Sequence, residues 1–280
     1  MSKIPRISAI MAVYNTKEEW LKESIESILN QTYSDFEFII INDGSTNNVE
    51  NVILSYKDER IKYIKQENQG LAKSLNNGLD IAKGEYIARM DSDDISLPER
   101  FEKQVKFLDE NLDISIVGTS HEYFPNGKIA KMLKYPKYID FLKGNSIGHP
   151  TVMFRRADFE KYDLKYNPEY LCEDYELWSR AIKYLKFANI QEILLKYRWH
   201  ENNLSKPNEK FEFSVRKVRQ NMLDFLTTDT TLQNNIITAI LPNINKNTTF
   251  IQKIFSIKNN NDKTKKIIRI LGLKIIYKRN

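Results

Sequence analysis

Residues 85–94 of the chain read EYIARMDSDD, a short apolar segment that runs directly into a serine and three acidic residues. The part from Glu85 to Met90 has the length and the apolar character of a strand buried in a sheet. Four more segments of this kind are expected to be strands: Ile7–Val13, Phe36–Ile41, Ile61–Ile64 and Ile114–Val117. Segments with helical spacing of apolar residues separate them. Regular alternation of strands and helices predicts an α/β fold with a doubly wound, mostly parallel sheet.

Two of the expected helices have recognisable start signals. Thr16 offers an N-cap with Glu19 three residues later, which is the pattern of a capping box. Pro98 is expected at the first position of a helix that runs to about Glu110, where its missing amide hydrogen costs nothing.

The pattern becomes less regular after Pro125. Strands are expected at His149–Phe154 and Ile193–Trp199, with a helix at Glu173–Tyr184 between them. We therefore expect a domain over residues 1–205, divided near residue 115, followed by a helical extension and a basic tail over residues 206–280.

Polar clusters follow three of the expected strands, at Tyr14–Asn15, Asp43–Ser45 and Asp91–Asp94. The carboxyl ends of parallel strands meet at one edge of a sheet, and ligands bind there in open α/β folds. Neither the glycine pattern of a dinucleotide site nor that of a P-loop is present. A nucleotide at this edge would have to be held without a glycine-rich phosphate loop.

The acidic cluster Asp91–Asp94 suits a hard divalent cation, Mg²⁺ or Mn²⁺, that bridges a diphosphate. The same residues would also suit a polar turn before the helix at Pro98. Asp43 has two interpretations as well, because its carboxylate could accept the imide N–H of a uracil ring or bond to its own turn.

Composition and charge exclude several classes of protein. The single cysteine, Cys172, allows neither an internal disulfide nor a thiolate metal site, which favours a reducing cytoplasm. No run of 18 apolar residues is present, and the first residues lack the pattern of a signal peptide. The net charge is +6.

Most of the positive charge lies in the tail. Residues 246–280 hold ten Lys or Arg and one acidic residue, a net charge of +9, which leaves −3 for residues 1–245. A uniform nucleic-acid-binding surface is therefore not expected, and we predict no nucleic-acid partner. The tail is expected to meet an anionic membrane surface, although the alternation of Leu271, Leu273 and Ile275 is also compatible with a strand packed on the body.

Eight short motifs occur in an order that resembles glycosyltransferase family 2, whose members are inverting enzymes with the GT-A fold. The motifs are Ala-Val-Tyr-Asn (12–15), Asn-Asp-Gly-Ser (42–45), Asn-Gln-Gly (68–70), Asn-Asn-Gly (76–78), Asp-Ser-Asp-Asp (91–94), His-Pro-Thr-Val-Met-Phe (149–154), Glu-Asp-Tyr-Glu-Leu-Trp (173–178) and Tyr-Arg-Trp-His (197–200). The resemblance covers about residues 4–205. It implies a nucleotide-sugar half before residue 115 and an acceptor half after it.

The resemblance also implies a role for each matching residue. Asp174 matches the catalytic base, and Asp93 and His200 match ligands of a Mn²⁺ or Mg²⁺ ion. The residues implied on the nucleotide-sugar side are Ala12 (where the family usually has proline), Tyr14, Asp43, Lys73, Asn76, Asp91, Ser92 and Asp93.

A UDP-sugar donor and a glycan or lipid-linked saccharide acceptor are implied partners. The resemblance thus predicts an enzyme of cell-surface polysaccharide or lipooligosaccharide synthesis, in the cytoplasm and peripheral on the inner face of the plasma membrane. Two alternatives remain open at this point: a nucleotidyltransferase of sugar metabolism and a non-catalytic sugar-binding protein.

Overall fold

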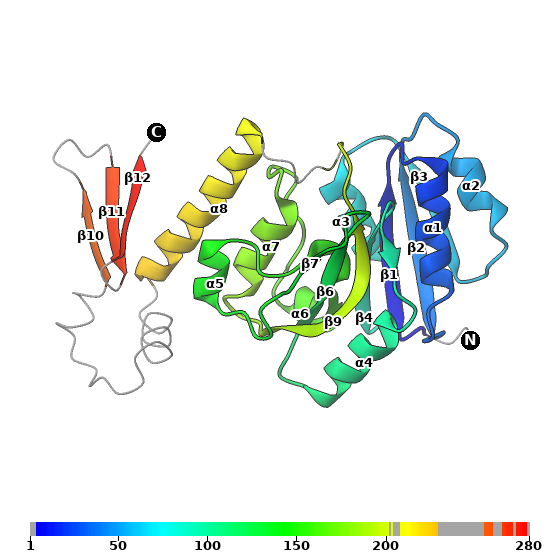
Figure 1. Cartoon of the computed structure of the whole chain (residues 1–280), viewed down its shortest axis with the longest axis horizontal. Helices are drawn as coiled ribbons and strands as arrows, with labels where there is room; N and C mark the ends of the chain where they lie inside the picture. The colour runs from blue at the N-terminus through cyan, green and yellow to red at the C-terminus, as the bar shows by residue number, and fades with distance from the viewer. Residues whose placement is uncertain are drawn as a thin grey trace. The chain divides into compact units, whose positions relative to one another are not determined.

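The computed structural model describes residues 4–201, 203 and 208–228, together with three strands in the range 255–278. The chain divides into two compact units, Met1–Arg219 and Gln220–Asn280. Figure 1 follows the first unit from the N-terminal strands in blue to the beginning of the yellow helix α8 (Glu209–Thr228). No helix among the described residues is both long and apolar enough to cross a bilayer.

Four parallel strands form the N-terminal half of the main sheet, in the order β3 (Ile61–Gln66), β2 (Phe36–Asp43), β1 (Ile7–Val13) and β4 (Tyr86–Asp91). Nearly every residue of β1 and β2 is buried, as their continuous apolar sequences predict. Ser8 interrupts this pattern without cost, because its hydroxyl donates to Glu37 Oε1 at 2.6 Å and accepts the amide of Gly84 at 2.8 Å.

Helices cover both faces of this half. One core cluster joins one face of β1 to α1 (Glu18–Leu29), α2 (Val49–Ser55) and α4 (Arg100–Glu110). The helix α3 (Leu71–Ile81) packs on the other face, so closely that a β-carbon on Gly78 would lie 2.6 Å from Ile10 Cγ2. The expected doubly wound, mostly parallel sheet is thereby confirmed.

The second half of the chain extends the same nine-stranded sheet. Strand β8 (Met153–Arg155) pairs antiparallel with β4 and with β6 (Ile116–Phe124), and β6 runs parallel to β9 (Phe187–Arg198). Two short strands, β5 (Ile95–Ser96) and β7 (Lys128–Ala130), pair with β9 and β6. The remaining helices of this half are α5 (Tyr138–Lys143), α6 (Arg156–Lys161) and α7 (Glu173–Ala181).

Three sequence expectations about local structure are wrong. Thr16 does not cap α1; Lys17 occupies that position, and the Thr16 hydroxyl instead lies 2.6 Å from the hydroxyl of Ser92. Helix α4 begins at Arg100, two residues after Pro98, whose carbonyl accepts the amide of Thr32. The segment His149–Thr151 is a short 3₁₀ helix (η1), and the strand starts only at Met153.

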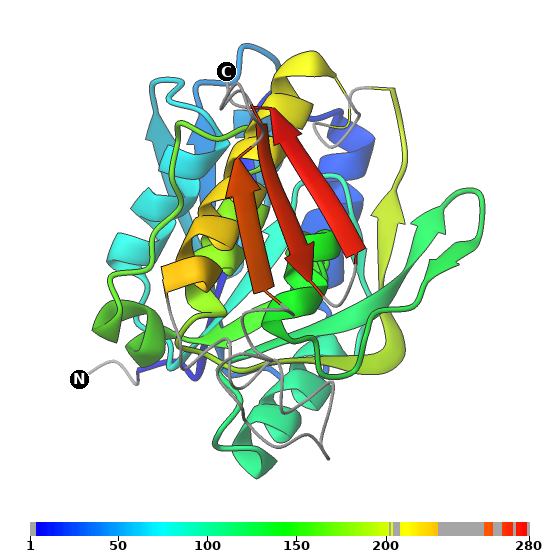
Figure 2. The same cartoon turned by 90° about the vertical axis from the view of Figure 1, so that its left-hand side faces the viewer.

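The C-terminal unit contains three antiparallel strands, β10 (Phe255–Asn259), β11 (Lys265–Ile270) and β12 (Leu273–Lys278), drawn in orange to red in Figure 2. β11 and β12 form a hairpin in which Ile270 pairs with Leu273. The backbone of the basic tail is therefore extended over these residues, in line with the alternating pattern of its sequence.

Candidate functional site

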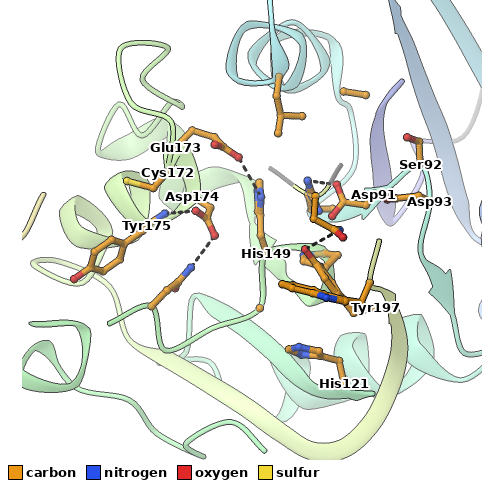
Figure 3. Close-up of a pocket in the computed structure, with 18 of the residues that line it drawn as sticks. Asp91, Ser92, Asp93, His121, His149, Cys172, Glu173, Asp174, Tyr175 and Tyr197 are labelled. Atoms are coloured by element: carbon orange, nitrogen blue, oxygen red, sulfur yellow. Dashed lines mark hydrogen bonds and ion pairs between the residues drawn. The ribbon is translucent and has the colours of Figure 1, made fainter. Parts of the chain in front are cut away.

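A cavity of about 910 Å³ lies at the carboxyl edge of the main sheet. It is lined by the ends of β1 and β4 from the first half of the chain, and by residues of β6, β9, η1 and α7 from the second half. Figure 3 shows Asp91, Ser92 and Asp93 on one side and Glu173 and Asp174 on the other, with His149 between them. The polar clusters that were expected at this edge do gather there.

The acidic cluster occupies the end of β4 and the turn that follows. Asp91, Asp93 and Asp94 can each place one carboxylate oxygen within 4.8 Å of the others. Arg89, two residues before Asp91 on the same strand, forms an ion pair with it. Burial and then the charge of Asp91 raise the pKa of Asp93, and the same two causes raise the pKa of Asp94 well above its usual value. This repulsion favours a bound cation.

His200 joins the acidic cluster from the end of β9. Its Nε2 lies 2.7 Å from Asp93 Oδ2, and its ring packs at 4.7 Å from the ring of Trp20 on α1. Asp93 and His200 are thus direct neighbours although 107 positions separate them in the chain.

Arg198 holds the acidic turn against β9. Its backbone amide donates to Asp94 Oδ1 at 2.7 Å, its Nε donates to the carbonyl of Asp93 at 2.7 Å, and its guanidinium also pairs with Glu23 on α1. The side chain is almost fully buried between these partners. Sequence reasoning assigned no role to Arg198, although it lies inside the Tyr-Arg-Trp-His motif.

The donors present suit a divalent metal ion. Carboxylate oxygens of Asp91 and Asp93 with one imidazole nitrogen make a mixed oxygen and nitrogen set, which Mn²⁺ accepts more readily than Mg²⁺ does. The Oδ2 atom of Asp94 is buried and has no hydrogen-bond partner among the described residues, so one oxygen of the cluster is left unsatisfied.

Asp43, Tyr14 and Ala12 all line the cavity. The carboxylate of Asp43 accepts hydrogen bonds from Gln66 Nε2 (2.7 Å) and from the amides of Gln69 and Gly70 (2.9 Å each), and so fixes the loop before α3. Tyr14 is 55% exposed, and Ala12 pairs with Asp91 in the register of β1 and β4.

The turn at residues 42–45 decides against one of the two interpretations of Asp43, in which its side chain bonds to its own turn. Asn42 Oδ1, not Asp43, accepts the amide of Ser45 at 3.0 Å. Gly44 follows with φ +71°, and a β-carbon there would lie 2.6 Å from the amide nitrogen of Asn68. Asp43 is therefore left to hold the neighbouring loop.

The structure does not bring Lys73 and Asn76 to the cavity. Both lie on α3 and neither is among the lining residues. Lys73 is exposed, and the amide of Asn76 makes two hydrogen bonds to the backbone of Tyr166, at 2.8 and 2.9 Å. Asn76 thus connects α3 to the segment before α7.

Asp174 lies in the first turn of α7, on the cavity wall opposite the acidic cluster. Its Oδ2 accepts Asn145 Nδ2 at 2.7 Å, and its Oδ1 accepts the amide of Tyr175 at 2.6 Å. Burial raises the pKa of Asp174, while these two hydrogen bonds act in the opposite direction and favour the carboxylate. Asn145 was not foreseen from the sequence, because no local pattern distinguishes it.

Glu173, beside Asp174, faces a buried polar cluster. Its Oε1 lies 3.6 Å from His149 Nδ1, and His149 Nε2 lies 2.9 Å from the hydroxyl of Tyr166. Burial and the charge of Asp174 raise the pKa of Glu173 to about 8, and burial lowers the pKa of His149 well below its usual value. At neutral pH the cluster therefore holds a protonated carboxyl and an uncharged imidazole.

Arg89 sits between the two sides of the cavity. Only 3% of it is exposed, and its Nε and Nη1 atoms have no hydrogen-bond partner among the described residues. It acts on the pKa values of Asp93, Glu173 and Asp174 in the same direction, by favouring their charged forms. The buried guanidinium of Arg89 thus favours the charged forms of carboxylates on both walls of the cavity.

Comparison with known proteins finds a family match and several relatives. The family model of Glycosyl transferase family 2 matches residues 8–163. An uncharacterized glycosyltransferase of Methanocaldococcus jannaschii is 44% identical over 208 residues, which cover 69% of this chain and 71% of that protein. The O-antigen biosynthesis glycosyltransferase WbnJ of Escherichia coli is 39% identical over 211 residues, 71% of this chain and 82% of its own.

A solved structure has the same fold. Residues 1–349 of S. aureus TarS, in complex with UDP-GlcNAc, superpose with a TM-score of 0.66 at 19% identity. The match covers 76% of this chain and 65% of that one, and it shows the GT-A fold for this chain.

Replacing Glu173 by Gln tests the buried protonated carboxyl. In the unfolded chain this carboxyl ionises near pH 4.5, whereas in the folded chain its pKa is about 8. The wild-type protein therefore loses stability as the pH rises from about 5 to about 8, and Glu173→Gln, which stays neutral, does not. The free energy of unfolding of the variant minus that of the wild type should therefore increase with pH over this range, by up to about 1.4 kcal/mol per pH unit. Urea denaturation at pH 5, 6.5 and 8 measures this, and a difference that does not change with pH would show that Glu173 is ionised in the folded protein.

Proposed function

This chain belongs to glycosyl transferase family 2, and from that premise we propose that it transfers a sugar from a UDP-sugar to a saccharide acceptor, with inversion at the anomeric carbon. The chain is a glycosyltransferase by its family and fold. The proposal adds the donor, the acceptor class and the stereochemistry. UDP is supported by TarS, whose structure holds UDP-GlcNAc.

One observation carries the proposal: the acidic cluster with His200 and the carboxylate of Asp174 line opposite walls of one cavity. An inverting displacement needs a leaving diphosphate on one side of the anomeric carbon and a deprotonated acceptor oxygen on the other. A cavity with a cation site on one wall and a hydrogen-bonded carboxylate on the facing wall supplies both.

The reaction proceeds in one step. The acceptor oxygen forms a bond to the anomeric carbon while the bond from that carbon to the UDP oxygen breaks, and UDP leaves with the electron pair. Asp174 takes the proton of the acceptor hydroxyl. A divalent ion, held by Asp93 and His200 with Asp91 beside them, would offset the charge that develops on the diphosphate.

Asp174 suits the role of base better than its two acidic neighbours on α7. Asn145 and the amide of Tyr175 orient its carboxylate and favour its ionised form. Glu173 is protonated at neutral pH, because its pKa is about 8. Glu176 is buried in an ion pair with Arg180 at 2.8 Å and does not line the cavity.

On the nucleotide side, we propose that Tyr14 packs against the uracil ring and that Asp43 accepts its imide N–H. Three donors already hold the Asp43 carboxylate in place, so the loop before α3 presents it in a fixed orientation. Ala12 and Ser92 line the floor beside them, while Lys73 and Asn76 are left out of this site.

The acceptor belongs, in this proposal, to a cell-surface glycan, free or linked to a lipid. The O-antigen biosynthesis glycosyltransferase WbnJ supports that pathway by its similarity. A lipid-linked acceptor fits the basic tail, since residues 246–280 carry a net charge of +9. We propose that this tail holds the enzyme peripherally on the anionic inner face of the plasma membrane.

Asp93→Ala tests the metal site. The variant should lower the affinity for UDP in the presence of Mn²⁺ by at least about tenfold, because one ligand of the ion is lost. The melting temperature should not fall, since the substitution also removes one of three repelling carboxylates. Isothermal titration with and without Mn²⁺ gives both affinities. Asp113→Asn, which removes an exposed carboxylate outside the cavity, is the control; equal Mn²⁺-dependent affinities in Asp93→Ala and the control would place the ion elsewhere.

Asp174→Asn tests the base. Asn keeps the shape and can still contact Asn145, but it cannot take a proton, so sugar transfer should fall by about 10²–10⁴-fold. The affinity for UDP with Mn²⁺ should stay near that of the wild type, because the nucleotide and the metal are held on the opposite wall. Transfer at the wild-type rate would leave Asp174 without a catalytic role. Loss of UDP affinity would instead assign Asp174 to the donor side.

Removal of residues 246–280 tests the membrane proposal. Binding to vesicles of phosphatidylglycerol and phosphatidylcholine should fall sharply, since the deletion removes a net charge of +9. Binding by the full chain should weaken as salt is added, because salt screens exposed charges. Co-sedimentation at two salt concentrations measures both effects, and undiminished binding by the shortened chain would refute this role of the tail.

A further inference from the structure

A cluster of aromatic side chains also lines the cavity. Tyr123 on β6 and Tyr197 on β9 are direct partners in the parallel register, with ring centroids 5.5 Å apart. Trp199 lies 5.9 Å from Tyr123 and 6.5 Å from Tyr197. All three line the cavity, so we call them the aromatic wall.

His121 lies next to the aromatic wall and contacts two of its rings. Its ring lies 5.2 Å from that of Tyr123 and 5.8 Å from that of Tyr197, and Figure 3 shows Tyr197 and His121 together on the wall. Burial lowers the pKa of His121 to about 4, so the imidazole is uncharged at neutral pH. His121 therefore adds no charge beside the aromatic wall at neutral pH.

Core packing alone does not explain the aromatic wall. Trp199, which directly follows β9, is a large apolar side chain that is 41% exposed where it lines the cavity. Tyr123 meets Trp199 at 85° and Tyr197 at 77°, so each pair is in edge-to-face contact and not stacked face to face. The ring of Trp199 keeps accessible surface, since this residue is exposed and lines the cavity.

The chemistry of this surface identifies its ligand. An uncharged aromatic wall offers nothing to a diphosphate, which requires cations or a metal ion. A pyranose ring, in contrast, has one face made mostly of C–H groups, which can be buried against aromatic faces while the hydroxyls point outward. Trp199 directly precedes His200 in the chain, and the aromatic wall lines the same cavity as Asp174.

We propose that Tyr123, Tyr197 and Trp199 form the acceptor platform, on which the terminal pyranose ring of the acceptor lies with a hydroxyl directed at Asp174. This inference rests on the proposed function and narrows it: the group that accepts the sugar is a hydroxyl of a sugar ring, not a lipid alcohol or a serine side chain. The platform determines which acceptor binds and does not take part in donor binding.

Saturation-transfer NMR with simple methyl pyranosides tests the platform in the full chain. The probes are the methyl β-glycosides of glucose, galactose and N-acetylglucosamine and methyl α-mannoside, each in the presence of UDP and Mg²⁺, which is diamagnetic, with 1-butanol as an alcohol that has no ring. At least one pyranoside should receive saturation, strongest on the ring protons of one face, and butanol should not. Binding of butanol alone would overturn the proposal, and so would absence of any pyranoside signal.

Substitutions test whether the pyranoside binds at the aromatic wall. Trp199→Ala and Tyr123→Ala should each weaken the pyranoside by about 3- to 10-fold, as loss of an aromatic contact does, and Trp199→Phe should restore most of the affinity. Tyr184→Ala is the matched control, because Tyr184 is an exposed tyrosine outside the cavity, stacked on Tyr162 at 4.9 Å. Equal pyranoside affinity in Trp199→Ala, Tyr123→Ala and the control would refute the platform.

Titration of UDP with Mn²⁺ into the wild type and each variant distinguishes a failure of the proposed function from a failure of the acceptor platform. If the wild type fails to bind UDP, the proposed function fails. If UDP binds and the platform variants still bind the pyranoside as the wild type does, only the platform is wrong.

Discussion

Three carboxylates within 4.8 Å of one another are the constraint around which the rest of the site is arranged. At such distances like charges repel by an amount that grows as water is excluded, and Asp94 is almost fully buried. The chain offsets this repulsion with Arg89, which pairs with Asp91, and with His200, which contacts Asp93. The buried Oδ2 atom of Asp94 has no hydrogen-bond partner among the described residues, so this compensation does not reach all three carboxyl groups.

The fold provides these partners from distant parts of the chain. Arg89 comes from the same parallel strand as the acidic turn, whereas Arg198 and His200 come from the end of β9, in the second half. Strand β8 makes this possible, because it pairs with both β4 and β6 and so joins the two halves into one sheet. Arg198 then fixes the turn itself, through its bonds to Asp93 and Asp94.

The sequence was sufficient for the parallel half of the sheet. Strands at Ile7–Val13 and Phe36–Ile41 were predictable because almost every residue in them is buried, and such strands read as continuous apolar runs. Side chains that bond across the sheet edge were not predictable. Thr16 had the local pattern of a cap, yet its hydroxyl faces Ser92, 76 positions away. Only the tertiary arrangement decides between two such partners.

The same distinction holds in the site. Asp91, Asp93, Asp174 and His200 could be named from motifs, since each belongs to a short ordered pattern, and all four line the cavity. Lys73 and Asn76 could not be judged in this way, because the side of α3 that meets the cavity depends on how the helix packs. Asn145 was missed for the opposite reason, because its role comes from Asp174, 29 positions away. Arg89 lies only two residues before Asp91, but its effect on Glu173 and Asp174 in the second half of the chain depends on the tertiary fold.

Because both walls of the cavity contain contributions from the second half of the chain, the cavity is built jointly by the two halves. His200 contacts the acidic cluster, and the strand that ends just before it carries Tyr197 and leads into Trp199 on the aromatic wall. A change in the twist or register of β9 would therefore move His200 and the aromatic wall together. The bulge between Thr119 and Glu122, where the pairing of β6 with β9 shifts, sits directly before Tyr123 and sets that register. The two register shifts in this strand pair thus decide which residues of β9 pair with the end of β6, and so place Tyr197 beside Tyr123.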